Sequence, residues 1–214
     1  MPFTINIRNQ ELILLPEKSI WWPQKKALIM ADLHLGKSTH FRNAGIGVPV
    51  KAEYDNLIRL DHILSSTQAT SVFFLGDLFH SKKNNVWYTF KDWMERWMNI
   101  RFFLILGNHD ILPLEEYYKS PLVLLGNSFA MEPFLLTHEP SDHIQGLYNL
   151  CGHLHPGVRI EGQAKQKLVL PCFYFGDHTG ILPAFGAFTG ISMIAPLKKD
   201  KVYVIAADQI IEMK

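Results

Sequence analysis

Side chains that bind metals recur in this chain directly after apolar, strand-like runs. They comprise two aspartates, one asparagine and four histidines, namely Asp32, His34, Asp77, Asn108, His138, His153 and His155. Open α/β sheets place their sites beyond the carboxyl ends of the strands, so we expect these side chains to converge at one edge of a sheet. The simplest chemistry for such a set is a pair of divalent cations that act on a phosphate ester.

Hard oxygen ligands combined with imidazole suit the cations that bind phosphate esters. The donor types predict a first cation position made by Asp32, His34, Asp77 and His155, and a second made by Asp77, Asn108, His138 and His153. Asp77 would bridge the two, because one carboxylate can give an oxygen to each cation. A pair of cations about 3.5–4 Å apart lowers the pKa of a shared water toward about 7 and so supplies a hydroxide nucleophile.

Three further residues lie beside these ligands in the sequence. His109 follows Asn108, which places it at the rim of the site, where an imidazole can protonate the departing alkoxide. We therefore predict His109 as the general acid, with Asp110 as the carboxylate that orients it. His80 follows Asp77 by three residues, and both a hydrogen bond beside the metals and a surface position are open for it.

Basic residues follow the first metal-binding segment. Lys37, His40 and Arg42 lie in a polar stretch that must border the site, so we predict that they contact substrate phosphate. An arginine can bind a phosphate with two hydrogen bonds. The alternative is a solvated surface turn.

The elements that position these residues alternate in the first half of the chain. Residues 3–7 and 11–15 predict a hairpin, residues 19–22 a further strand, and residues 27–31, 71–75 and 101–106 apolar central strands. Residues 51–65 and 85–99 have helical periodicity, and the aromatic stripe of the second predicts a core face. The resulting β-α-β-α-β order predicts parallel strands with right-handed crossovers.

Short strand-like runs dominate after Pro113, and they predict a meander of antiparallel strands. The runs are residues 122–125, 128–131, 134–137, 147–151, 158–161, 167–175, 191–195, 202–206 and 209–213. The two halves together predict an α/β fold, a four-layer αββα sandwich of two mixed sheets flanked by helices.

Length and composition set the broad class. The 214 residues suit a single domain over residues 1–214, with 48% hydrophobic and 19% charged residues, an ordinary globular balance. The net charge of +1 does not indicate a protein that attracts nucleic acid through its overall charge, although a local patch of basic residues would suffice for binding.

Two cysteines in apolar runs predict buried free thiols and a reducing compartment. With neither a signal peptide nor a membrane span in the sequence, we expect a cytoplasmic protein without a membrane partner.

The metal-binding segments resemble the calcineurin-like metallophosphoesterase superfamily. Its pattern is D-x-H, G-D, G-N-H-[DE], a lone His and G-H-x-H. It is matched in full by Asp32-Leu33-His34, Gly76-Asp77, Gly107-Asn108-His109-Asp110, His138 and Gly152-His153-Leu154-His155. The resemblance implies the αββα fold and hydrolysis with two divalent metal ions, for which we expect Mn²⁺, with iron or zinc as alternatives.

A narrower resemblance extends over nearly the whole chain. Residues 31–37, 40–42, 74–81 and 182–190 are similar to the bacterial ligase-associated DNA-damage-response endonucleases. This similarity implies a DNA endonuclease in DNA repair that works beside a DNA ligase, a helicase and a second nuclease. The segment 182–190 itself predicts a packed loop that closes over one edge of the sandwich.

Other functions of the same chemistry stay open at this point. A phosphomonoesterase, a cyclic-nucleotide phosphodiesterase or a nucleotide-sugar phosphohydrolase would use the same metal site, because surrounding loops fix the substrate. A non-enzymatic scaffold that has lost its metals is disfavoured, since every ligand position and His109 are intact. The sequence therefore predicts a metal-dependent phosphodiesterase that acts on DNA.

Overall fold

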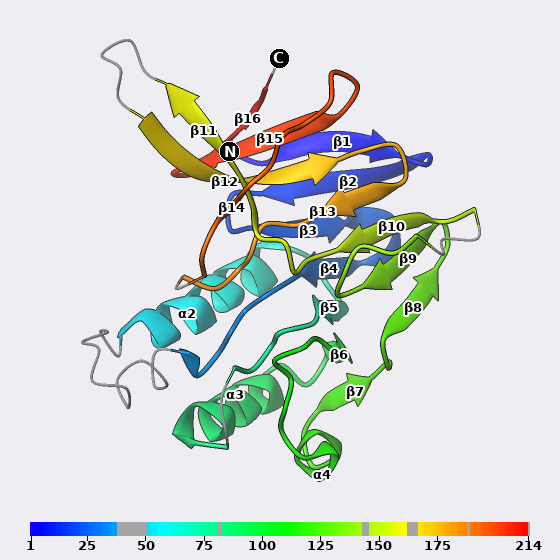
Figure 1. The fold of residues 1–214 in the computed structure, drawn as a ribbon. Helices are drawn as coiled ribbons and strands as arrows, with labels where there is room; N and C mark the ends of the chain where they lie inside the picture. Colours follow the sequence, from blue (N-terminus) through cyan, green and yellow to red (C-terminus); the bar gives the residue numbers. More distant parts are fainter. Residues whose placement is uncertain (38–50, 81–82, 143–145, 162–166, 188, 214) are drawn as a thin grey trace.

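The computed structural model describes residues 1–37, 51–80, 83–142, 146–161, 167–187 and 189–213, and of residues 51–53 only the backbone. Seven strands form the first sheet in chain order (Figure 1). They are β1 (Phe3–Ile7), β2 (Gln10–Leu15), β3 (Ser19–Trp22), β4 (Ala27–Met30), β5 (Ser71–Leu75), β6 (Arg101–Ile105) and β7 (Leu122–Leu124). Strands β1 to β4 pair antiparallel, and β4 to β7 pair parallel.

The helices of the described residues accompany the first sheet. They are η1 (Pro23–Lys25), α2 (Lys51–Ser66), α3 (Asn85–Arg96) and α4 (Leu114–Tyr118). Helix α3 begins at an asparagine cap, because the side chain of Asn84 accepts a hydrogen bond from the Val86 amide. Asp61 of α2 then accepts hydrogen bonds from the indoles of Trp93 and Trp97, at 2.7 and 3.1 Å, which ties α2 to α3.

The remaining strands form the second sheet. They are β8 (Ser128–Met131), β9 (Phe134–Thr137), β10 (Tyr148–Cys151), β11 (Pro156–Glu161), β12 (Lys167–Phe175), β13 (Thr179–Ile181), β14 (Ser192–Met193), β15 (Lys201–Ala206) and β16 (Gln209–Glu212). The main path runs β14-β11-β12-β13-β10-β9-β8, and β15 pairs with both β12 and β16. Pairing is mixed, since β10 lies parallel to both β9 and β13.

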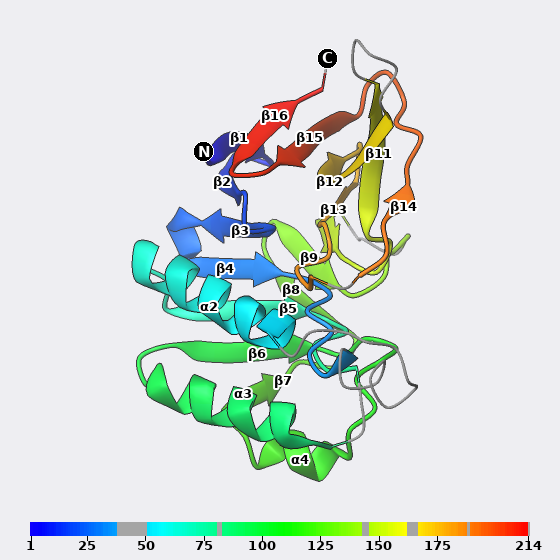
Figure 2. The same cartoon turned by 90° about the vertical axis from the view of Figure 1, so that its left-hand side faces the viewer.

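Two large apolar cores hold these layers together. One lies between the helices and the first sheet, where Trp87 and Phe90 of α3 pack with Phe74 of β5. The other lies between the two sheets and includes Phe73 of β5 and Tyr203 of β15. Alternate residues of β5 thus face opposite cores, as the period of two in a strand requires. Figure 2 shows the helices beside the first sheet and the second sheet away from them.

The predicted α/β sandwich of two mixed sheets with flanking helices is confirmed, with two corrections. First, the antiparallel meander was too simple a prediction. Strand β7 joins the first sheet parallel to β6, and the segment after β9 crosses over so that β10 runs parallel to it. Second, the helices of the described residues cover the first sheet only, so a second helical layer does not appear there.

Local predictions of the buried residues hold in detail. The aromatic stripe of α3 is core, and both cysteines, Cys151 and Cys172, are buried and free. A packed loop was predicted for residues 182–190. Of these, Leu182 and Phe185 are buried, and the Phe185 amide donates to the carbonyl of Ala31, so residues 182–187 pack on the end of β4. Within the described ranges, none of the helices combines the length and the apolar character that crossing a bilayer requires.

Candidate metal centre

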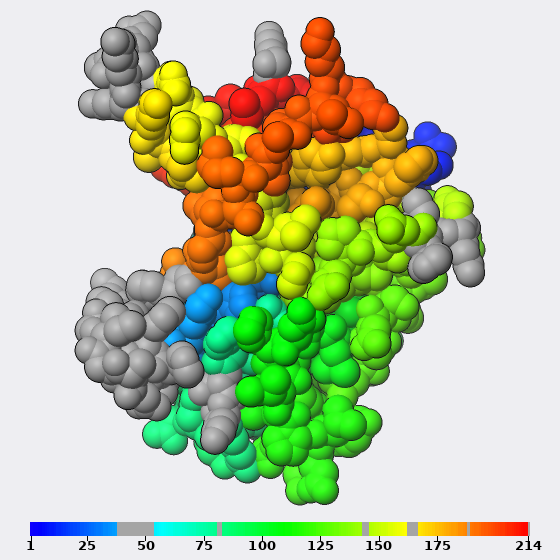
Figure 3. Space-filling view, viewed as in Figure 1, coloured from blue at the N-terminus to red at the C-terminus, as the bar shows by residue number. Residues whose placement is uncertain are grey.

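The predicted ligands meet where the ends of β4, β5, β9 and β10 come together. The loops that follow these strands are held by backbone hydrogen bonds, from the Asp32 amide to the Gly76 carbonyl and from the His34 amide to the Asp77 carbonyl. The Gly152 amide donates to the His138 carbonyl across the second sheet. On the face drawn in Figure 3, blue, green and yellow segments that lie far apart in the sequence meet in one region.

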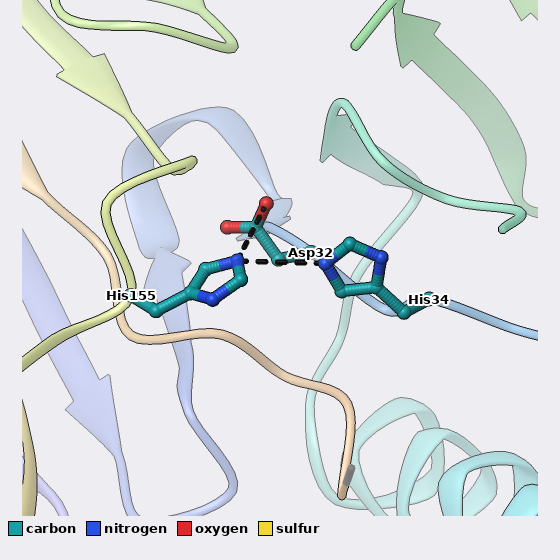
Figure 4. Close-up of side chains that lie close together, drawn as sticks. All are labelled: Asp32, His34 and His155. Atoms are coloured by element: carbon teal, nitrogen blue, oxygen red, sulfur yellow. Dashed lines mark hydrogen bonds and ion pairs between the residues drawn. The ribbon is translucent and has the colours of Figure 1, made fainter. Parts of the chain in front are cut away.

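Three residues of the first cation position form one compact group. Asp32 is fully buried at the end of β4, and His34 and His155 approach it from two different loops (Figure 4). The Nε2 atoms of the two imidazoles lie 3.4 Å apart, and Nε2 of His155 lies 3.4 Å from Oδ1 of Asp32. All these atoms can therefore face a single cation.

A second compact group consists of Asp32, Asp77 and His138. Asp77 lies between the two groups, because its Oδ2 is 3.7 Å from Nε2 of His34 and its Oδ1 is 3.4 Å from Nε2 of His138. Its position agrees with the predicted bridge, and Asp32, which belongs to both groups, is equally placed between them. Two carboxylates rather than one thus separate the two positions.

Hydrogen bonds select the metal-facing atoms of His138 and His153. Nδ1 of His138 lies 2.9 Å from the Leu75 carbonyl and must donate to it, which leaves Nε2 as the free ligand atom. Nδ1 of His153 lies 3.1 Å from that Nε2. These two imidazoles therefore converge on the second cation position. Asn108 is more exposed, and its amide nitrogen donates to Glu139 at 3.0 Å.

Five of the seven predicted ligand residues have a left-handed backbone. Their φ angles are 55° for Asp32, 48° for His34, 50° for Asp77, 66° for His153 and 47° for His155. Residues other than glycine seldom adopt this backbone region, because their Cβ atom crowds the following carbonyl. Such conformations gather at functional sites, where the surrounding structure enforces them.

Glycines beside the ligands allow close approach. A Cβ on Gly152 would lie 2.5 Å from Oδ2 of Asp32, and a Cβ on Gly107 would lie 2.4 Å from Oδ1 of Asp77. Both distances are far below a van der Waals contact. These glycines are therefore required by the space the two carboxylates occupy.

The donor set fits divalent cations. Oδ1 of Asp32 is buried and receives no hydrogen bond from any described residue, although an ionised oxygen in such a place needs a positive partner. Burial, together with the neighbouring Lys37 and other imidazoles, lowers the pKa of His34 to about 2, so that imidazole is neutral and ready to bind metal. Carboxylate and neutral imidazole are the ligands that the predicted metals accept.

His109 lies at the rim, as predicted. Its amide donates to Oδ1 of Asp77 at 2.9 Å, and its ring, 49% exposed, places Nε2 3.9 Å from Oδ2 of the same residue. His80 is not on the outer surface but inside the cluster. Its Nδ1 lies 3.1 Å from Nδ1 of His34, and its ring contacts that of His109 at a tilt of 36°, with centroids 3.8 Å apart.

Asp110 has a different role from the predicted one. Its carboxylate accepts hydrogen bonds from the backbone amides of Phe79 and Gly107, at 3.1 and 2.9 Å, and none from the ring of His109. Burial raises the pKa of Asp110 to about 6. The residue therefore joins the two loops that carry Asp77 and Asn108, and the orienting hydrogen bond to His109 is not formed.

Of the predicted substrate contacts, only Lys37 lies within the described residues; His40 and Arg42 lie outside them. Lys37 is half-buried, and burial lowers its pKa while Asp77 and Asp32 act in the opposite direction. Its charge is therefore close enough to the centre to interact with both carboxylates.

Comparisons with known proteins gave matches of two kinds. Residues 25–177 match the family model described as calcineurin-like phosphoesterase. Among solved structures, the chain is similar to the crystal structure of the Pseudomonas putida nuclease MPE, with 30% sequence identity, a TM-score of 0.84 and complete coverage of both chains. A search of curated proteins gave no match.

Proposed function

Since the chain belongs to the calcineurin-like phosphoesterase family and is a metal-dependent phosphoric ester hydrolase, we propose that it is a two-metal phosphodiesterase that cleaves DNA. The observation that carries the proposal is the likeness to a nuclease over the full length of both chains. The family model covers residues 25–177, whereas the likeness to the nuclease extends over the whole of both chains, and the parts of a fold outside its catalytic centre are those that choose the substrate.

The cation positions account for the reaction type. His34 and His155 would hold one cation, and His138, His153 and Asn108 the other, with Asp32 and Asp77 placed between the two positions and Mn²⁺ as the proposed metal. When bound, the two cations would neutralise charge on the phosphoryl oxygens and provide an activated water. The protein's own contribution is to keep His34 neutral by burial and to hold both carboxylates between the imidazoles.

His109 would protonate the leaving oxygen. Its backbone is fixed by Asp77, while its half-exposed ring can reach a bound ester. A general acid of this kind contributes typically 10²–10⁴-fold to a rate. Lys37, with His40 and Arg42, would bind the phosphates on either side of the cleaved bond.

The biological setting is proposed from the same residues that suggested the DNA endonuclease branch. We propose an endonuclease of DNA repair in the cytoplasm that works beside a DNA ligase, a helicase and a second nuclease. Residues 182–187, which carry part of that similarity, pack on the end of β4, where the Gly186 amide donates to the carbonyl of Asp32. They therefore support the metal centre directly.

The proposal is tested by comparing substrates in the presence of Mn²⁺. Supercoiled plasmid, linear single-stranded DNA, bis-p-nitrophenyl phosphate and p-nitrophenyl phosphate would be incubated with the wild-type protein and with His109→Ala. We expect cleavage of both DNA and the phosphodiester, and little turnover of the monoester. Turnover of the monoester alone, or of cyclic nucleotides or nucleotide sugars in preference to DNA, would replace the proposal with one of those activities.

A further inference from the structure

Glu139 follows the ligand His138 and contacts two residues of the second cation position. Its Oε1 accepts a hydrogen bond from the amide nitrogen of Asn108 at 3.0 Å and lies 3.9 Å from Nε2 of His153. Its carboxylate is 54% exposed, so in the sequence it resembles an ordinary solvated charge. It is, however, the one described carboxylate that touches both of these side chains.

The contact with Asn108 decides which atom of the amide can bind a cation. An asparagine side chain has one oxygen that can coordinate and one NH₂ group that cannot. Because Glu139 takes the NH₂ group, the oxygen is the atom left for the metal. A rotation of the amide by half a turn would set two carbonyl-type oxygens against each other and would present NH₂ to the cation.

The contact with His153 acts on the imidazole in the same way. Nδ1 of His153 faces Nε2 of His138, so Nδ1 must be free of its proton when a cation lies between them. The ring proton then belongs on Nε2, and the carboxylate of Glu139 lies within ion-pair distance of that atom. A carboxylate that receives the other ring N–H of a metal-binding histidine fixes the tautomer and the ring orientation.

A buried polar network holds the backbone of Glu139 in place. The hydroxyl of Thr137 donates to the Glu139 carbonyl at 2.6 Å, and the same hydroxyl accepts from the amide nitrogen of Asn149 at 2.8 Å. Asn149 is fully buried and also accepts from the Ser141 amide. The turn that carries Glu139 is therefore anchored from both sides, and its side chain starts from a defined position.

We propose that Glu139 is a positioning residue that sets the cation-facing atoms of Asn108 and His153 and thereby completes the second cation position. The inference rests on the two-metal centre of the proposed function, but on no property of its substrate. The inference predicts that loss of the Glu139 carboxylate weakens binding of the second cation and leaves binding of the first unchanged.

The test is calorimetric titration of Mn²⁺ into metal-free protein, followed for each equivalent separately. We expect Glu139→Ala to weaken the second equivalent by about 10–100-fold and to leave the first unchanged, as loss of an outer-shell partner does. Glu139→Gln keeps an acceptor oxygen and should restore most of the affinity. Glu161→Ala, which removes a carboxylate of similar exposure, 63%, on β11, is the matched control and should bind both equivalents as the wild type does.

Each other outcome overturns the inference. Equal binding of both equivalents by Glu139→Ala, equal weakening of both, or a wild-type isotherm with a single equivalent would each contradict it. Unfolding of the metal-free variants followed by circular dichroism shows whether the fold is kept. If the Ala variant unfolds, Glu139→Leu, which keeps the bulk of the side chain without an acceptor oxygen, is measured in its place and should show the same loss of the second equivalent. Two normal equivalents without DNA cleavage would instead refute the proposed substrate and leave Glu139 in place.

Discussion

The first and second cation positions are built by different means. Asp32 and His34 of the first are buried among the strand ends, where packing restricts them together with hydrogen bonds to the His153 amide and the His80 ring. Asn108 and His153 of the second lie nearer the surface, and they are oriented by the acceptors that face them, Oε1 of Glu139 for Asn108 and Nε2 of His138 for His153. The difference teaches that burial adds to the hydrogen bonds and makes the first position rigid before any cation arrives, whereas the second relies on hydrogen bonds at a more exposed place. We therefore expect the first cation to bind more tightly.

The largest effect should come from the carboxylate that both groups share. Asp32→Asn removes a charge from both positions, so both cations should be lost and turnover should fall by more than the roughly 10–100-fold cost of an outer-shell change. Manganese analysis of dialysed protein, with bis-p-nitrophenyl phosphate turnover, measures both. Retention of two equivalents would refute the placement of Asp32 between the positions.

His109→Ala should separate chemistry from cation binding. The ring lies at the rim and no ligand atom is lost, so both Mn²⁺ equivalents should remain while kcat falls about 10²–10⁴-fold. The measurement is a steady-state rate beside a calorimetric titration on the same preparation. A parallel loss of metal would mean that His109 supports the site rather than the leaving group.

His80 allows the first position to be dissected. Nδ1 of His34 must donate to Nδ1 of His80 when Nε2 of His34 binds metal, so His80→Phe should weaken the first equivalent about tenfold. His80→Asn offers an acceptor oxygen near the same place and should bind Mn²⁺ almost as the wild type does. If Phe were tolerated and Asn were not, the ring contact with His109 would be the important one instead.

The smallest effect is on the stability of the metal-free protein at low pH. Burial holds the folded-state pKa of His34 near 2, while the unfolded chain takes up a proton near pH 6.5, so stability from this residue is lost as pH falls below 6.5. Between pH 7 and pH 5.5 the loss is about 1 kcal/mol. The His34→Asn variant should not show this loss. The measurement is the free energy of unfolding in urea and EDTA for both proteins at both pH values. The difference between the two proteins cancels the contribution of Asp110, which has the opposite sign.

The central strands of the first sheet and the candidate ligands are the features that the sequence can indicate, because both are local patterns. Residues 71–75 form an apolar run that becomes the buried strand β5, and the polar residue after it, Asp77, can only emerge at the strand end. Pairing between distant strands is not local, so the parallel neighbours of β10 and the sheet that β7 joins could not be derived. Helix α4 and strand β13 are too short for a periodic signal.

Residues that act through others were the hardest to predict. Asp110 was assigned to its sequence neighbour, but the backbone turns it toward the amides of Phe79 and Gly107. Glu139 gave no signal, because a glutamate before a proline is typical of a surface turn and only the fold brings Asn108 to it. Sequence identifies atoms that bind metal, whereas the atoms that orient them are revealed by three-dimensional contacts.

The left-handed backbone at five ligand residues lowers the stability of the fold, although the activity depends on the side chains at these positions. Each such residue costs on the order of 1 kcal/mol compared with glycine. A library selected for heat resistance in the absence of metal should therefore accumulate glycine at positions such as 155, where the side chain is partly exposed and little packing would be lost. Such a selection would yield sturdier proteins that have given up catalysis.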